Sequence, residues 1–510
     1  MPKTSKHRAP APDGAQAPAA ASPGTPPAHR HRALAMLVLI VASFMDLLDA
    51  TIVNVGLPAI QQDIHATPGH LEWVVGGYTL AFAVVLITGG RLGDIVGRRT
   101  IFLTGVAGFT SSSLAAALAH SGDVLVAARV AQGAFAALMI PQVLASVQAL
   151  YKPKERTAIL GVIGAVSGLA AVAGPLLGGW LVSADAFGIG WRSIFVINLP
   201  VGLALIVAAW RLVPDTRSAR PLRLDLPGLL LVSTGLFLLV FPLVEGRDAG
   251  WPGWILGMLA ASPLVLGAFV VNQRRRMRRD GSPLAPMHLF ADRGFTAGSI
   301  VQLCFSGAMA GFFLILALYL QLGLHFSAMA SGLALLPFTV GAFLGSGVSA
   351  PLAPKIGKPL VITGALMQTG GILWLRHVVD VHGTGLSGWD LLWPLALAGL
   401  GLGFLVVPLV DLALATVDVH DAGAASGVYG TFQQFGGALG VAVTGVVFFG
   451  RSHDGYDPSV LKSALLAGAL VCAAGYLLAA LAALLLPASR LVRHDDETAD
   501  GEQERQAVPA

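Results

Sequence analysis

Long runs of uncharged, apolar residues follow one another along almost the whole chain, and short segments between them carry most of the charges. Each run is close to the ~20 residues that a helix needs to cross a bilayer. The runs are continuous, whereas the strands of a membrane barrel alternate apolar and polar positions over about 10 residues. This pattern predicts an all-α polytopic membrane protein.

The apolar runs divide into fourteen predicted membrane-spanning helices. The composition supports this division, because 55% of the residues are hydrophobic and 12% are charged, whereas soluble domains carry about 25% charged residues. The two cysteines, Cys304 and Cys472, lie far apart in apolar runs, so we expect neither a disulfide nor a metal site. The fourteen spans are 33–60, 71–91, 100–119, 123–149, 158–183, 191–213, 227–245, 252–272, 295–322, 330–352, 360–378, 389–417, 424–449 and 460–486.

The basic residues indicate how these spans are oriented. If the N-terminus is cytoplasmic, the inner segments hold 26 of the 32 lysines and arginines, and the outer segments hold five. This is the bias that the positive-inside rule describes. We therefore expect a multi-pass protein of the cytoplasmic membrane with both termini in the cytoplasm. The basic block at 274–279 follows a span directly, so we expect it to set topology and contact anionic lipids, and not to bind nucleic acid.

Short motifs repeat at a nearly constant distance, which predicts two related halves. Gly97 aligns with Gly357 at an offset of 260 residues, and Pro141 aligns with Pro408 at an offset of 267. Paired halves around a midplane site are the architecture of secondary transporters. The predicted organisation is a disordered cytoplasmic tail at 1–32, a six-helix half at 33–213, two inserted helices with basic cytoplasmic loops at 214–294, a second six-helix half at 295–486 and a cytoplasmic tail at 487–510.

Two carboxylates interrupt the first apolar run. Asp46 and Asp49 are three residues apart, so they occupy neighbouring positions on one helix face. Intramembrane acids are rare and mark substrate or proton pathways. Two carboxylates this close in a low dielectric cannot both be charged cheaply, so we expect them to titrate as a unit. A purely structural pair is the alternative.

Three further positions carry charge in or beside the predicted spans. Arg129 lies about six residues inside the fourth span, where an arginine costs about 2.5–3.5 kcal/mol to insert. We expect it to face a wet cavity or a counter-ion, since snorkelling to the interface would have to bridge ~9 Å. Asp411 in the twelfth span is a candidate second ionisable site. Glu72 and Trp73 open the second span, where interfacial residues are expected.

A turn flanked by charges follows the second span, in the stretch GRLGDIVGRR. A glycine permits the tight bend, and the aspartate can cap the next helix or pair with an arginine of a neighbouring helix. Such a pair is a two-state element that would hold the cytoplasmic side closed. The alternative is a turn whose charges serve topology alone. The candidate gate residues are Gly90, Asp94, Gly97, Arg98 and Arg99.

Small residues crowd the fifth predicted span. They let neighbouring helices approach closely, and a proline loosens the backbone hydrogen-bond ladder at that depth. Ordinary tight packing explains this face as well as a hinge or seal does. The candidate residues are Gly174, Pro175, Gly178 and Gly179.

Taken together, these motifs resemble the major facilitator superfamily, and within it the fourteen-span drug:proton antiporters. The resemblance extends over about residues 33–486. It implies that Arg129 lines the cavity and couples proton movement, that Asp49 belongs to the shared proton machinery, and that the small-residue face of the fifth span is an exporter hinge. Two positions depart from the family pattern. A basic residue is usual at the position of Ile95, and an apolar residue is usual at the position of Asp46. Asp46 is therefore a candidate contact for a basic group on the substrate. The matching motifs are LDATIVNVGLP (Leu48–Pro58), GRLGDIVGRR (Gly90–Arg99), RVAQGAFAALMIP (Arg129–Pro141), GLAAVAGPLLGG (Gly168–Gly179), WRSIFVINLPVG (Trp191–Gly202) and QQFGGALGVAV (Gln433–Val443).

These observations predict a proton-coupled antiporter that exports amphipathic drug-like or antibiotic compounds. The sequence contains no Gly-x-x-x-x-Gly-Lys-Ser/Thr loop, so we expect no enzyme activity, no cofactor and energy from the proton-motive force. The expected partners are a small-molecule substrate, cationic compounds included, together with protons and membrane lipids. The alternatives are a dedicated exporter of one endogenous product, an importer of the same superfamily, and a channel or membrane scaffold.

Overall fold

The computed structural model describes residues 32–151, 153–185, 188–217, 224–247, 249–279, 283–415, 417, 422–451 and 457–487. The two predicted tails, apart from their innermost residues, lie outside these ranges. Within them every regular element is a helix, so the all-α prediction is confirmed for the part of the chain that the structure describes.

The long helices follow one another with short connections. The α-helices are α1 (Arg32–Ile64), α2 (Pro68–Val96), α3 (Arg98–Ala117), α4 (Gly122–Leu150), α5 (Pro153–Ala184), α6 (Ser193–Val196), α7 (Asn198–Leu212), α8 (Leu226–Glu245), α9 (Gly253–Arg279), α10 (Arg293–Leu318), α11 (Ala328–Ala334), α12 (Leu336–Ile356), α13 (Lys358–His382), α14 (Leu392–Leu414), α15 (Ala422–Arg451) and α16 (Pro458–Ala483). The shorter turns that matter below are η2 (Gly190–Arg192) and η4 (Tyr319–Gly323).

Twelve helical segments in the described ranges are long and apolar enough to cross a membrane. One of them joins η2, α6 and α7, and another joins α11 and α12. Helices α5 and α13, with 32 and 25 residues, are not among the twelve. The count of fourteen spans therefore stays a prediction.

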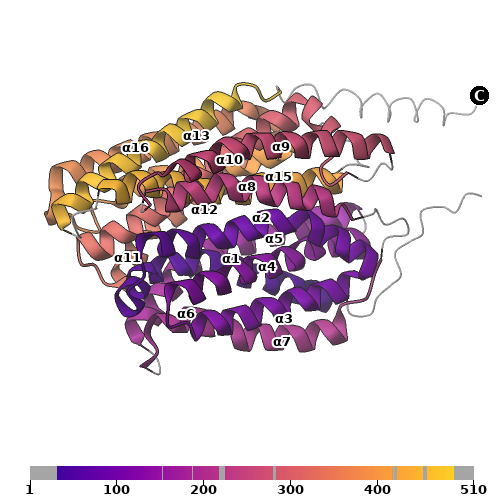
Figure 1. Ribbon diagram of the computed structural model, residues 1–510, viewed down its shortest axis with the longest axis horizontal. Coiled ribbons are helices and arrows are strands. Elements are labelled where there is room, and N and C mark those ends of the chain that lie inside the picture. The colour runs from indigo at the N-terminus through magenta and orange to yellow at the C-terminus, as the bar shows by residue number, and fades with distance from the viewer. Residues whose placement is uncertain are drawn as a thin grey trace, which may run out of the picture.

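The helices form two bundles side by side (Figure 1), with α1–α7 in one and α10–α16 in the other. In the first bundle α2 packs against α4, and α1 against α5; in the second α12 packs against α14, and α10 against α15. The bundles meet where α2 packs against α15 and where α5 packs against α11. Helix α8 lies between the bundles in Figure 1 and contacts α9, α2 and α15.

Local sequence sets where the helices begin and end. Ser121 caps α4 by accepting a hydrogen bond from the Val124 amide, as small polar residues do at helix starts. Gly97 separates α2 from α3 with φ 128°, and Gly357 separates α12 from α13 with φ 59°, and only glycine adopts such angles readily. The sequence repeat aligns these two glycines, and each forms the turn between the second and third long helices of a repeated unit, α2 and α3 or α12 and α13.

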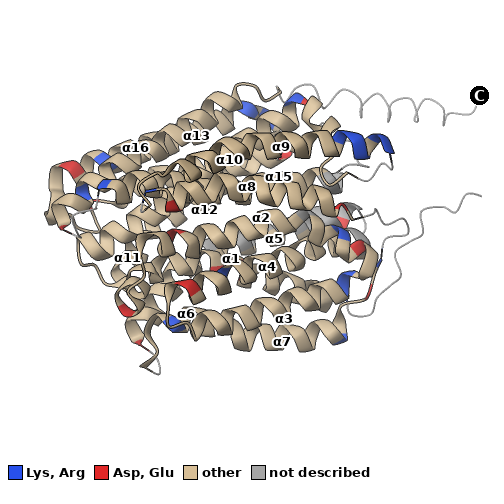
Figure 2. Cartoon of the chain, viewed as in Figure 1, with Lys and Arg blue, Asp and Glu red and all other residues tan. Residues whose placement is uncertain are grey.

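Lys and Arg residues gather at one end of the helices, which we call the basic end (Figure 2). The last turn of α9, with Arg276, Arg278 and Arg279, lies there, and so does Arg98 at the start of α3. The Arg91 side chain near the end of α2 donates a hydrogen bond to the Pro283 carbonyl beyond α9, which joins these segments. The other end, where α1 ends and the loop between α8 and α9 lies, is called the opposite end.

Candidate functional site

Asp49 lies on α1 inside the first bundle, and its carboxylate is fully buried. Its Oδ2 accepts a hydrogen bond from Arg129 Nη1 at 2.5 Å. Its Oδ1 accepts from Gln132 Nε2 at 2.9 Å and from Asn198 Nδ2 at 2.7 Å. Three donors, one of them charged, replace the water that an ionised carboxylate loses on burial.

Arg129 on α4 is equally enclosed, with 1% of its surface exposed. Besides the ion pair, Nε donates to the Val74 carbonyl at 3.0 Å, and Nη1 also donates to Gln132 Oε1 at 2.6 Å. The guanidinium carbon lies 4.2 Å from the ring centroid of Tyr78 and 5.9 Å from that of Phe195, within the range of cation–π attraction. The arginine is thus paired with an acid and lies close to two aromatic rings.

Ser113 on α3 connects the neutral donors of this network. Its Oγ accepts from Gln132 Nε2 at 2.7 Å and from Asn198 Nδ2 at 3.2 Å. The side chains around Asp49 come from α3, α4 and α7, so four helices of the first bundle meet at one carboxylate. All of these hydrogen bonds lie within the first bundle.

Asp46, one turn before Asp49, has its own donor. The Tyr78 hydroxyl donates to Asp46 Oδ1 at 2.5 Å, and the aspartate is 6% exposed. The same tyrosine ring faces the Arg129 guanidinium. The two acids expected to act as a pair therefore bind different donors, and Tyr78 connects Asp46 to the arginine.

The charged turn after α2 is compact. Arg98 Nη2 lies 3.1 Å from Asp94 Oδ1, and its Nη1 donates to the Ala145 carbonyl of α4 at 3.2 Å. A Cβ at Gly97 would lie 2.5 Å from an Asp215 carboxylate oxygen, so a side chain has no room there. Asp94 thus pairs within its own motif, and the arginine ties that motif to α4. Of the remaining gate candidates, Gly90 faces Pro141 and Arg99 is half-buried.

The small-residue face of α5 packs on both bundles. A Cβ at Gly174 would lie 1.9 Å from Thr51 Oγ1 on α1, and one at Gly178 would lie 2.8 Å from Ile52 Cγ1. On the other side, a Cβ at Gly179 would lie 2.7 Å from the Ala328 carbonyl at the start of α11. A Cβ at Gly332 of α11 would in turn lie 2.5 Å from the Pro175 carbonyl. This face is therefore part of the contact between the bundles at the opposite end.

Two further acids singled out in the sequence have surroundings different from those of Asp49. Asp411 is exposed three residues before the end of α14, and the structure does not bring it to the Asp49 network. Glu72 was expected among interfacial residues, yet it is 1% exposed. The loop after α8 covers it and supplies Arg247, with Nη1 3.4 Å from Glu72 Oε1.

Sequence reasoning missed the neutral members of the site: Tyr78, Ser113, Gln132 and Asn198. Gln132 and Asn198 stand in two of the quoted motifs, and Gln132 follows Arg129 by three residues, which places both on one helix face. That spacing was the available signal. Within the described ranges no group of three or more His, Cys, Asp or Glu is arranged to hold a metal ion.

A family profile described as Major Facilitator Superfamily matches residues 39–441. The chain is 41% identical over 467 residues to a protein named probable actinorhodin transporter from Streptomyces coelicolor, covering 91% of this chain and 80% of that protein. It is 36% identical to the tetracenomycin C resistance and export protein of Streptomyces glaucescens, covering 82% and 76% of the two chains.

The fold also matches a solved structure. A bacterial homolog of the human lysosomal transporter Spinster, in an inward-facing and unoccupied conformation, superposes with a TM-score of 0.63 at 16% identity. The match covers 91% of this chain and 98% of that one. At this identity the likeness concerns the fold alone.

Proposed function

This chain belongs to the Major Facilitator Superfamily, a family of multi-pass membrane transporters, and we propose that it is a proton-coupled antiporter that exports antibiotic-like amphipathic compounds. Relatives with names that state antibiotic transport or export support the direction and the class of compound. The expected fourteen passes and the cytoplasmic position of the basic end belong to the same proposal, and the gathering of arginines at that end supports them.

The observation that carries the proposal is the charge balance of the buried site. Asp46, Asp49 and Arg129 are all nearly inaccessible, and two acids face one arginine. With both acids ionised the site would hold one uncompensated negative charge in a low dielectric, which a bound proton or a cationic group would neutralise. Proton and substrate would then compete for one charge, which is what exchange of the two across a membrane requires.

In the proposed cycle the neutral donors keep Asp49 in place while its charge changes. Asn198 and Gln132 can donate to the carboxylate whether or not Arg129 stays within hydrogen-bond distance. Asp46 is the better candidate for a basic group on the substrate, because one hydroxyl, that of Tyr78, is the donor it would have to release.

A dedicated exporter of one compound is the second candidate. The names of the two relatives each state a single compound, actinorhodin or tetracenomycin C, and this favours a narrow substrate range. Export of one of these compounds, but of no chemically unrelated antibiotic, would support it.

The test uses inverted membrane vesicles that carry the protein and an acid-inside pH gradient. Tetracenomycin C is added, and the loss of the gradient is followed with a pH-sensitive dye. We expect a substrate-dependent loss with the unchanged protein and with D123N, whose carboxylate is 90% exposed at the surface. We expect none with D49N; substrate-coupled proton movement that persists in D49N would refute the assignment.

The role of Asp46 needs a second pair of probes. D46N should lose transport of ethidium, which is cationic, and retain transport of a neutral compound. Equal losses for both compounds would exclude a specific contact with a basic group.

A further inference from the structure

Helix α8 covers the line along which the two bundles meet. Its apolar face contacts α2 and α15 together, in a cluster separate from the other cores. The buried members of this cluster are Leu80, Leu236, Val240, Val244, Ala438 and Ala442. A helix in this position contacts both bundles at once, so any movement of α2 relative to α15 must change its packing.

At the opposite end the same line is closed by a buried ion pair. Glu72 on α2 faces Arg247, which follows α8, and Arg247 Nη1 also lies 3.5 Å from the Gly445 carbonyl on α15. A Cβ at Gly445 would be 2.4 Å from Glu72 Cδ, so the carboxylate lies directly against the α15 backbone. The Arg247 guanidinium carbon is also 5.1 Å from the Phe449 ring centroid.

A second contact fastens the end of α8 to α2. Trp73 Nε1, one residue along from Glu72, donates to Oε1 of Glu245, the last residue of α8, at 2.9 Å. The end of α8 is therefore bonded to α2 through Glu245, and the loop after it is bonded to α2 and to α15 through Arg247. Both Glu72 and Arg247 are nearly closed to solvent, with side-chain exposures of 0% and 7%.

This acid differs from Asp49 in what surrounds it. The partners of Asp49 all belong to the first bundle, so a rigid movement of one bundle against the other leaves them in place. The surroundings of Glu72 come from α2, the α8–α9 loop and α15, and the same movement separates them. An acid whose environment changes with a conformational step contributes to the equilibrium of that step.

We propose that Glu72 and Arg247 form a lock at the opposite end, which holds α2 against α15 and releases when the bundles separate there. The proposal rests on the proposed function in that it assigns a step of alternating access to this end. Glu72 and Arg247 act as positioning residues: they touch neither the substrate nor the Asp49 network, and they set how often the opposite end opens.

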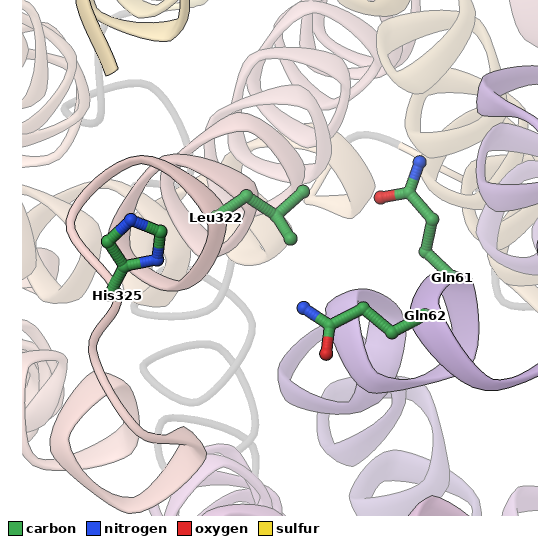
Figure 3. Close-up of a pocket in the computed structure, with 4 residues that line it drawn as sticks. All are labelled: Gln61, Gln62, Leu322 and His325. Atoms are coloured by element: carbon green, nitrogen blue, oxygen red, sulfur yellow. The ribbon is translucent and has the colours of Figure 1, made fainter. Parts of the chain in front are cut away.

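A nearby pocket provides a place to measure that opening. A cavity of about 290 Å³ at the opposite end is lined by Gln61 and Gln62 of α1 and by Leu322 and His325 at the end of η4 (Figure 3). Gln61 and Gln62 belong to the first bundle, whereas Leu322 and His325 belong to the second, and their side chains face the same space in Figure 3. The distance across this pocket reports the separation of the bundles at this end.

The experiment places spin labels on Q62C and H325C, with Cys304 and Cys472 replaced by alanine. Distance distributions are recorded by pulsed electron resonance on substrate-free protein in lipid nanodiscs. E72Q and R247Q should each raise the ratio of the long to the short distance by about tenfold, within the range typical of coupling between sites. The double variant E72Q/R247Q should not multiply the two effects, because each single substitution already breaks the same pair.

The matched control breaks an ion pair at the same end but inside one bundle. Asp63 Oδ2 of α1 lies 2.6 Å from Arg192 Nη1 of η2, so D63N removes a partly exposed ion pair that lies inside the first bundle. D63N should leave the distances unchanged. E72Q and R247Q distributions that match that of D63N would overturn the proposal, and so would effects that multiply in the double variant.

If E72Q does not fold, R247Q tests the same pair from the loop between α8 and α9, with no substitution inside α2 or α15. The measurement uses no substrate and no pH gradient, so its failure would leave the proton-coupled export of the proposed function standing. Failure of export in vesicles would equally leave a shift in the distances intact.

Discussion

Asparagine in place of Asp49 keeps the shape of the side chain but removes the negative charge that faces Arg129. The arginine would remain buried with the Val74 carbonyl and Gln132 Oε1 as acceptors and without a counter-ion at hydrogen-bond distance. Glutamine in place of Arg129 does the reverse and leaves a buried carboxylate with two neutral donors. We expect each single substitution to destabilise the fold more than the removal of both charges together.

The structure sets the size of this effect. At 2.5 Å between Arg129 Nη1 and Asp49 Oδ2, the attraction of two unit charges is about 7 kcal/mol at an effective dielectric constant of about 20. Burial of each ion costs several kcal/mol, so the intact pair contributes little net free energy. Loss of one partner typically destabilises by about 3–5 kcal/mol, because the other charge stays buried. The double variant D49N/R129Q should therefore be at least ~2 kcal/mol more stable than the sum of the single effects predicts.

The assay is equilibrium unfolding of the four proteins in dodecyl maltoside micelles titrated with sodium dodecyl sulfate. The free energies of unfolding give the interaction energy of the cycle directly. All three variants should fail to transport, so stability, and not activity, is the informative readout. Single losses below about 1 kcal/mol, or a double loss equal to the sum of the single ones, would refute the argument that the two charges balance each other.

The remaining predictions use the same titration. Y78F removes the hydroxyl that binds Asp46 but keeps the ring, so it should lower the free energy of unfolding by about 1.5–3 kcal/mol, as for a hydrogen bond to a charged group; a loss as large as that of D49N would contradict this. G174A places a methyl group 1.9 Å from Thr51 Oγ1 and should destabilise by about 1–3 kcal/mol. Its control is G347A in α12, where nothing lies within 4 Å and alanine should stabilise the helix by up to ~1 kcal/mol; equal effects at the two sites would contradict close packing of α5 on α1.

The fold was predictable to the extent that the bilayer imposes a simple pattern. A helix that crosses hydrocarbon needs a long apolar run, so helix positions could be read directly from the sequence. The single predicted span at 191–213 is instead three short elements, η2, α6 and α7. The whole stretch is apolar enough on average to count as one membrane-crossing segment, so its average hydropathy does not mark these breaks.

The charged residues of the site were predictable, and their partners were not. Asp49 and Arg129 stand out because charge is rare in apolar runs. Ser113 and Asn198 do not, since single neutral polar residues occur in many membrane helices as ordinary packing contacts. Which of them reach Asp49 depends on how α3 and α7 pack against α1, and packing of helices distant in sequence is not encoded in any local pattern. The burial of Glu72 was not predictable for the same reason, because the loop that covers it begins more than 170 residues later.

Helix α1 gives a physical route from the buried charge to the contact between the bundles. Thr51 lies two residues after Asp49 and packs against Gly174 of α5. The Val55 carbonyl, four residues further on, accepts a hydrogen bond from Gln321 Nε2 in the second bundle at 3.0 Å. These positions span about 9 Å of helix at 1.5 Å per residue, and a hydrogen-bonded helix moves as one body over so short a length. In the proposed cycle, a proton that weakens the attraction between Asp49 and the arginine would shift α1 and so displace its contacts with α5 and with the second bundle together. An acid at the end of a helix that contacts neither α5 nor the second bundle could not change the contact between the bundles in this way.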